Sequence, residues 1–233
     1  MNELLSELDS VFQSPTIKPT FDYVHVVLSL FLFGENTEGI GRYRLQKELE
    51  IGAGTVKSLF NKLKTVTKYI IVPSEGDLKA GELQRRGHVL TQKGFVFLAK
   101  VKKKIPLLRK ADLKYLKEII IKQEDVNSYF CLVKKSSTKL RYGVEQRDAA
   151  IKVNGSGATC LVYDGVNLFF PTKSKIKDDT NNTQINPETL NYFKSEIEAA
   201  KVKIEKNDVI IIGSGDNYQK ARLATLNAAL TLL

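Results

Sequence analysis

The sequence predicts an α+β chain of two domains, and three observations support this prediction. The first hundred residues contain apolar positions at helical spacing, whereas short apolar strands alternate with helices in the second half. Positive charge is concentrated in residues 40–104, which hold fifteen Lys and Arg against five Asp and Glu. Residues 1–39 (net −5) and 105–233 (net +5) cancel, so the central segment accounts for the whole net charge of +10. A polyanionic partner would be attracted to that one segment.

The first domain is predicted over residues 20–105, after an N-terminal extension over residues 1–19. Apolar periodicity and boundary residues define its elements. We expect helices over Asp22–Phe33, Arg42–Glu50, Thr55–Lys64 and Gln92–Ile105, and strands over Tyr69–Pro73 and Leu83–Leu90. Gly34 should end the first helix, and Thr91 should cap the last one.

The third predicted helix has one apolar and one polar face. Its core stripe follows i, i+3, i+4, i+7 spacing and consists of Val56, Leu59, Phe60 and Leu63. The opposite face presents Thr55, Lys57, Ser58, Asn61, Lys62 and Lys64. Gly52 and Gly54 precede it, and we expect glycine there to accept the positive φ of a sharp turn between helices. The preceding helix is expected to have Tyr43, Leu45 and Leu49 as its apolar positions.

The order of helix, helix, turn, helix, two-stranded wing and helix is that of a winged helix-turn-helix. Two motifs carry a resemblance to prokaryotic winged-helix transcription regulators. Ile51-Gly-Ala-Gly-Thr-Val-Lys-Ser-Leu-Phe-Asn-Lys-Leu resembles their turn and recognition helix, and Arg86-Gly-His-Val-Leu-Thr-Gln-Lys-Gly resembles their second wing strand entering the last helix. This resemblance covers residues 20–105. The whole chain loosely resembles uncharacterised archaeal winged-helix proteins, a resemblance that implies no substrate.

The polar face of the third helix is the predicted DNA-binding surface. Side chains that hydrogen-bond to base edges are needed near the start of a recognition helix, and cations are needed near phosphates. Thr55, Ser58 and Asn61 suit the first task, and Lys57, Lys62 and Lys64 suit the second. The wing contributes Arg85, Arg86 and His88, and the second helix contributes Arg42 and Arg44 as backbone contacts. The alternative is an ordinary polar face of a protein-binding winged helix.

A second α+β domain is predicted over residues 123–233, after a mostly helical connector over residues 106–122. Its expected elements are strands over Val126–Val133, Gly157–Tyr163, Asn167–Phe170 and Asp208–Ile212, with helices over Val144–Val153, Pro187–Ala200 and Tyr218–Leu233. Residues 173–186 are polar and are expected to form a loop. The order β-α-β-β-α-β plus a terminal helix predicts a ferredoxin-like sheet. Helices on one face would leave the other face to the connector or to a second subunit.

Two glycine-bearing turns in this domain are candidate ligand sites. The turn at residues 154–157 contains Gly155 and Gly157, and the turn at residues 213–216 consists of Gly213, Ser214, Gly215 and Asp216. Free amides at a helix start suit a phosphate or carboxylate. The spacing matches no nucleotide fingerprint, so a tight turn with Ser214 or Asp216 as the helix cap is the competing interpretation. Arg147 and Asp148 are either an effector clamp or a local ion pair.

The composition argues against several other classes. The longest apolar run, residues 24–33, is too short to span a bilayer, and the acidic N-terminus does not look like a signal peptide, so we expect a cytoplasmic protein without membrane contact. Cys131 and Cys160 should be buried free thiols, because they are far apart and both lie in apolar strand-like runs, and their spacing from the two histidines gives no zinc site. No catalytic residues, metal site or cofactor are predicted.

These observations together predict a DNA-binding transcription regulator. Double-stranded DNA is the expected partner, a homodimer the expected assembly, and the C-terminal domain is expected to sense a small-molecule effector, to mediate dimerisation, or both. Two alternatives remain open at this point. One is an enzyme or cofactor-binding protein with its site at the glycine turns, and the other is a chromosome- or replication-associated adaptor that uses the winged helix for protein contacts.

Overall fold

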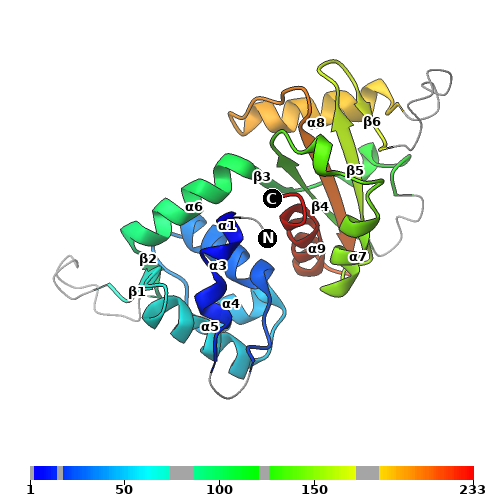
Figure 1. The fold of residues 1–233 in the computed structure, drawn as a ribbon. Helices are drawn as coiled ribbons and strands as arrows, with labels where there is room; N and C mark the ends of the chain where they lie inside the picture. The colour runs from blue at the N-terminus through cyan, green and yellow to red at the C-terminus, as the bar shows by residue number, and fades with distance from the viewer. Residues whose placement is uncertain (1–2, 15–17, 74–86, 121–125, 172–183) are drawn as a thin grey trace. The chain divides into compact units, whose positions relative to one another are not determined.

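The computed structural model describes residues 3–14, 18–73, 87–120, 126–171 and 184–233 (Figure 1). The chain divides into two compact units, Met1–Val101 and Lys102–Leu233, which are described separately below. Both units contain helices and strands, so the structure confirms the α+β class. The predicted connector, residues 106–122, lies within the C-terminal unit.

The N-terminal unit is built around a buried helix. In chain order its elements are α1 (Glu3–Ser6), α2 (Asp9–Phe12), α3 (Tyr23–Glu35), α4 (Arg42–Leu49), α5 (Ala53–Thr65), β1 (Ile70–Ile71), β2 (Val89–Leu90) and α6 (Gln92–Lys104). Most of α3 is apolar and buried, and α4 and β2 pack against it. The strands β1 and β2 are antiparallel, and an isolated bridge pairs Ile40 with His88.

Glycine roles in this unit differ from the predicted ones. Gly34 lies inside α3 and does not end it; a Cβ on Gly34 would lie 2.5 Å from Cδ2 of Leu98, so its small size permits close packing. The turn between α4 and α5 takes its positive φ at Glu50 (φ 54°). Gly52 is instead an extended N-cap with φ −67°, and Gly54 lies within the first turn of α5. The predicted cap of α6 is confirmed, because Gly94 N donates to Thr91 Oγ1 (3.1 Å).

The C-terminal unit contains a five-stranded sheet in which all neighbouring strands are antiparallel. Its elements are β3 (Leu107–Lys110), η2 (Leu113–Tyr115), β4 (Asn127–Val133), η3 (Ser137–Lys139), α7 (Val144–Lys152), β5 (Gly157–Tyr163), β6 (Leu168–Phe169), α8 (Pro187–Ala199), β7 (Val209–Gly215) and α9 (Tyr218–Leu230). The order in the sheet is β3-β4-β7-β5-β6. The prediction of a mostly helical connector is wrong, because its first part forms the edge strand β3.

The strand order also differs from a ferredoxin-like sheet. The chain follows the predicted β-α-β-β-α-β sequence from β4 to β7, and α9 is the predicted terminal helix. In a ferredoxin-like sheet the first and third strands form the central pair, and the last strand lies at an edge. Here the last strand, β7, lies between β4 and β5, and it pairs with both along most of its length.

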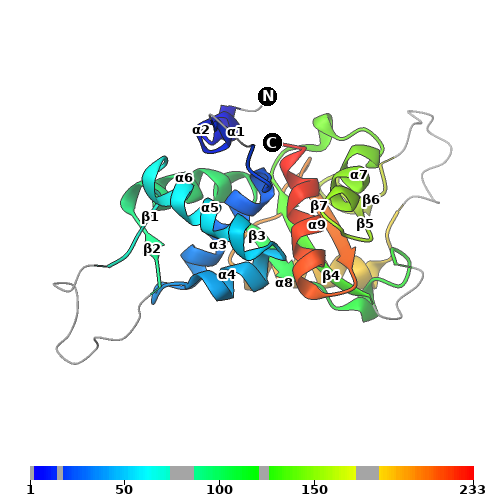
Figure 2. The same ribbon diagram turned by 90° about the horizontal axis from the view of Figure 1, so that it is seen from below.

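Helices cover both faces of this sheet (Figures 1 and 2). On one face, Phe193 and Ile197 of α8 pack with Phe130 of β4 and Ile210 of β7 in one apolar core. On the other face, α7 and α9 pack against β4, β5 and β7. The exposed sheet face that we expected to need a second subunit is therefore absent from the described part of this unit, and a homodimer remains a prediction without that support.

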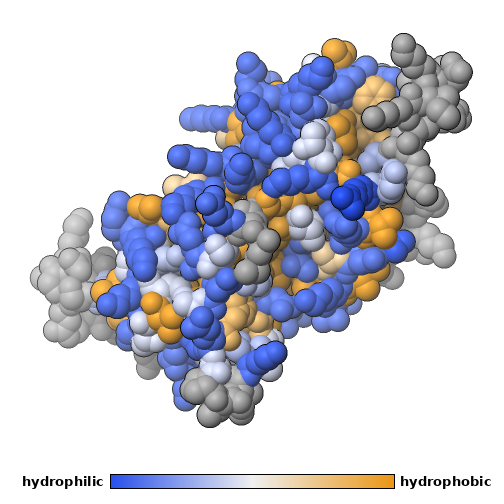
Figure 3. All heavy atoms as spheres, in the orientation of Figure 1, coloured by the Kyte–Doolittle hydropathy of each residue, from blue (hydrophilic) through white to orange (hydrophobic). Residues whose placement is uncertain are grey.

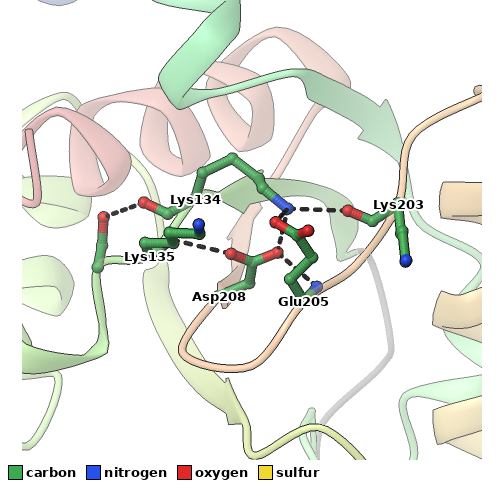
Figure 4. A network of polar contacts seen from close by, with 6 residues as sticks. Lys134, Lys135, Lys203, Glu205 and Asp208 are labelled. Atoms are coloured by element: carbon green, nitrogen blue, oxygen red, sulfur yellow. Dashed lines mark hydrogen bonds and ion pairs between the residues drawn. The ribbon is translucent and has the colours of Figure 1, made fainter.

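A buried carboxylate fixes the turn that leads into β7 (Figure 4). Asp208 is fully buried, and its Oδ2 accepts from Lys134 Nζ (2.6 Å) and from Glu205 N (2.8 Å). Its Oδ1 accepts from Lys135 N (2.8 Å). Lys134 Nζ also donates to the Lys203 carbonyl at 2.8 Å. The network thereby ties the end of β4 to the start of the central strand.

Candidate nucleic-acid interface

Helix α5 presents the predicted polar face to solvent. The predicted core stripe is confirmed, since Val56, Leu59, Phe60 and Leu63 are all buried. On the opposite side, a shallow hollow of about 490 Å³ is lined by Gly54, Lys57, Ser58, Asn61, Lys62, Thr65 and Val66. Lys57, Asn61 and Lys64 are exposed, and Ser58 is partly exposed. The centre of this face is therefore free to meet a partner.

One flank of α5 is already occupied by the chain's own N-terminal segment. The hydroxyls of Thr55 and Thr20 share a hydrogen bond of 2.7 Å. Seven residues further along the same helix, Lys62 Nζ donates to the Gln13 carbonyl. Thr55 and Lys62 are thus predicted site residues at one edge of the polar face, whereas Ser58 and Asn61 lie nearer its centre.

Two cations, Arg42 and Lys64, lie near His88, which directly precedes strand β2. The ring of His88 meets the ring of Phe60 edge to face at 4.8 Å, and its backbone pairs with Ile40. Burial lowers the pKa of His88, and the positive charges of Lys64 and Arg42 lower the pKa further. Three predicted site residues from three separate elements are therefore close enough to influence one another electrostatically.

The start of α4 adds backbone N–H donors beside these cations. Its N-cap is Gly41, and among the described residues no side chain caps the helix. The first amides of a helix have no partner within the helix, and the helix dipole places partial positive charge there. The exposed guanidinium groups of Arg42 and Arg44 belong to the same turn. An anion such as a phosphate is stabilised in such a place.

One residue of this surface was misassigned from the sequence. Tyr43 was expected on the apolar face of α4, but 89% of it is exposed, while Leu45 and Leu49 are buried. The spacing could have shown this, because Leu45 and Leu49 are i, i+4 partners and a residue two positions before Leu45 points to the opposite side. A tyrosine hydroxyl between two arginines can donate to a phosphate oxygen. The predicted wing residues Arg85 and Arg86 lie outside the described residues.

The predicted ligand residues of the C-terminal unit meet at one end of the sheet, where Gly157 pairs with Ser214. Three of their four glycines have packing roles, whereas Gly157 has a positive φ (148°). A Cβ on Gly213 would lie 2.4 Å from Oγ1 of Thr225, and a Cβ on Gly215 would lie 2.8 Å from the Ala221 nitrogen. Gly155 similarly leaves room for Ala224, so α9 fills the space above these positions.

The charged residues of that predicted site are paired locally. The guanidinium of Arg147 donates to the carboxylate of Asp148 (2.9 Å), and both side chains are exposed. Lys220 Nζ donates to Asp216 (2.8 Å), and this hydrogen bond lowers the pKa of the Asp216 carboxyl. The helix cap expected at Ser214 or Asp216 is instead Asn217, whose side chain accepts from Lys220 N. The ligand-binding role of these residues remains untested.

A larger hollow in the C-terminal unit was not foreseen. It measures about 920 Å³ and lies beside the end of β3, η2 and α8; its lining includes Lys110, Lys114, Tyr115, Tyr192 and Tyr218. Tyr115 and Tyr192 stack at 4.6 Å, and the Lys110 ammonium lies 3.9 Å from the centre of the Tyr218 ring. The hollow was not predicted because residues 106–122 were expected to form a mostly helical connector, whereas β3 and η2 lie there.

The two cysteines are buried free thiols, as predicted. Burial raises the pKa of both thiols, that of Cys160 to about 12, so neither is an activated nucleophile at neutral pH. Among the described residues, no group of three or more His, Cys, Asp or Glu side chains could hold a metal ion. Within the same residues, no helix combines the length and the apolar character needed to cross a membrane.

Comparison with known proteins gives one domain match and one structural match. Residues 125–232 match a domain of unknown function, DUF4443. A hypothetical protein from Pyrococcus horikoshii OT3 has a similar structure, with a TM-score of 0.60 and 23% sequence identity over 90% of this chain and 91% of that one. This similarity extends over both units and concerns the fold alone. No curated protein matches the chain.

Proposed function

We propose that the N-terminal unit is a winged-helix DNA-binding domain that places α5 in the major groove. The observation that carries this proposal is the exposed polar face of α5, with the exposed cations Arg42 and Lys64 beside it. An α-helix fits the width of the major groove, and 13 residues of helix extend about 20 Å along it. The order of elements from α3 to α6 is the one that such a domain requires.

The residues of this face divide into two roles. Ser58 and Asn61 are short hydrogen-bonding side chains in the middle of the exposed face, so we assign them to base edges. Lys57 and Lys64 are exposed cations at its sides, and we assign them to phosphates together with the first turn of α4. Phosphate contacts set the position of the helix in the groove, and base contacts provide the sequence preference.

At the level of the whole protein, we propose a transcription regulator. A single DNA-binding unit joined to a second folded unit is a common arrangement in which the second unit senses a ligand or joins two copies. The mixed aromatic and charged hollow beside β3 and α8 is then the preferred place for a small-molecule effector, because the glycine turns predicted from the sequence are filled by α9.

Salt-dependent duplex binding tests the proposal. Fluorescence anisotropy of a labelled duplex would be measured with the full chain between about 50 and 200 mM salt. We expect each phosphate contact to contribute about −0.9 to the log–log slope, so Lys57→Ala and Lys64→Ala should each make the slope shallower by about that amount. Lys117→Ala, an exposed lysine of the C-terminal unit, is the control and should leave the slope unchanged. Binding that ignores salt, or equal slopes in all variants, would contradict the assignment.

A further inference from the structure

Described residues on both sides of residues 15–17 are fixed to the N-terminal unit before α3 begins. On the N-terminal side, Leu8 and Val11 are fully buried, and the ring of Phe12 lies 4.3 Å from that of Tyr23 and 5.7 Å from that of Phe21. Glu7 adds an ion pair with Lys100 of α6 (2.8 Å). These contacts anchor α2 on the body of the N-terminal unit. The chain between Phe12 and Phe21 is therefore held close to the unit at both of its ends.

Two hydrogen bonds place this segment beside the proposed recognition helix. Thr20 reaches Thr55 in the first turns of α5, and the Gln13 carbonyl receives the ammonium of Lys62. Thr55 and Lys62 are seven residues apart, which corresponds to two helical turns, or about 10 Å, along one flank. Gln13 and Thr20 therefore contact the same flank of α5 at two points, two helical turns apart.

The charge of the segment suits a polyanion. Residues 10–21 contain no Asp or Glu, and their single charged residue is Lys18. Lys18 is exposed and lies two residues before Thr20, which contacts the start of α5. The Gln13 carbonyl is neutral, so its hydrogen bond orients the ammonium of Lys62 without cancelling the charge. Lys18 of the segment and Lys62 of α5 therefore both place positive charge along this edge of the helix.

We propose that residues 18–20 are a second DNA-contacting element, in which Lys18 binds a backbone phosphate beside the groove that receives α5. Thr20 is a positioning residue: its hydroxyl pair with Thr55 holds Lys18 at the start of the helix. The segment thereby widens the footprint of the domain on one side of α5. The proposal rests on the DNA-binding function proposed above, because it names an additional contact of the same interface.

The test compares how steeply the duplex affinity of the full chain and its variants falls with salt concentration. Lys18→Ala should make the log–log slope shallower by about 0.9, which corresponds to roughly an eightfold loss of affinity at 0.1 M salt if counter-ion release is the whole contribution. Thr20→Val removes the hydroxyl pair but keeps the shape of the side chain. In the Thr20→Val background, Lys18→Ala should reduce duplex affinity by less than it does in the wild type, since the lysine is no longer held in place. Lys117→Ala serves as the control, and melting curves show whether each variant is folded.

The outcomes separate this proposal from the function on which it rests. If the wild type binds no duplex at low salt, the proposed DNA-binding function itself fails. If the wild type binds and Lys18→Ala keeps its slope and affinity, the segment makes no phosphate contact and this proposal is overturned. Tighter binding by Lys18→Ala or Thr20→Val would also overturn it, because the segment would then compete with DNA for the flank of α5.

Discussion

Loss of the Asp208 carboxylate should strongly destabilise the C-terminal unit. In Asp208→Ala, two backbone N–H groups, those of Lys135 and Glu205, lose their acceptor, and the ammonium of Lys134 loses its closest partner. Each orphaned donor costs about 1–3 kcal/mol, although Lys134 is still 19% exposed and keeps Glu205 at 3.2 Å. Breaking a buried pair by removing one partner typically costs about 3–5 kcal/mol, and we expect a loss of free energy of unfolding in this range.

The assay is urea unfolding of the full chain, followed by tyrosine fluorescence and circular dichroism. Lys134→Met is the reciprocal variant, because it leaves the fully buried Asp208 without its ammonium partner. The double variant should be less destabilised than the sum of the single variants, since neither charge is then left alone. Additive effects, or a loss below about 1 kcal/mol in Asp208→Ala, would show that the network does not hold β4 and β7 together as described.

Three further predictions follow from buried or crowded positions. Burial lowers the pKa of His25, whose Nδ1 accepts from Asp22 N (2.9 Å) at the start of α3. The folded state therefore favours the neutral ring. The contribution of His25 to stability is complete above about pH 6.5 and is lost as the pH falls below that value. Unfolding free energies at pH 7 and pH 5 check this, and His25→Gln, which keeps an acceptor, should weaken the pH dependence. A DNA phosphate beside His88 would raise its lowered pKa, so duplex affinity should increase between pH 7 and pH 5.5; a pH-independent affinity that His88→Gln leaves unchanged would count against a phosphate there. Gly213→Ala should destabilise the chain by about 1–3 kcal/mol or more, because the new Cβ meets the backbone nitrogen of Thr225 at 2.5 Å. Gly54→Ala is the control: Gly54 lies inside α5 with open space around the Cβ, so the variant should be neutral or slightly stabilising in thermal melts.

Local patterns predicted the elements that depend on local interactions. The four-residue apolar stripe of α5 and the cap at Thr91 need only neighbours within a turn or two, and both are present in the structure. Strand β5 was predicted at its observed bounds, Gly157–Tyr163, because a glycine and a turn delimit its apolar run. The polar face of α5 could be predicted for the same reason, since helical spacing alone separates it from the core.

The remaining features depend on contacts between residues far apart in the sequence. The order of strands in the sheet follows from which apolar faces pack together, and the sequence from β4 to β7 is compatible with more than one order. Edge strand β3 has only four residues, and its apolar leucines fit a helical pattern equally well. Gly213 and Thr225 meet only in the folded chain, so a glycine that permits close packing looks like a ligand-binding turn in the sequence.

The same holds for the candidate interface. The contact of Thr20 with Thr55 joins residues 35 positions apart, and no periodicity indicates that the N-terminal segment lies beside α5. The sequence predicted each of three site residues, Arg42, Lys64 and His88, from its own element. Their mutual proximity depends on how α4, α5 and β2 pack together. Tyr43 was misassigned because an aromatic residue was counted as apolar without regard to its position on the helix.

Selection from a randomised duplex library tests the central proposal most directly. The full chain should enrich a defined sequence, and Asn61→Ala should lose about 1–3 kcal/mol of discrimination at one base pair while melting at an almost unchanged temperature. Lys64→Ala should instead weaken binding evenly across all sequences. Failure of the wild type to enrich any sequence, together with no measurable duplex binding at low salt, would contradict the placement of α5 in the major groove.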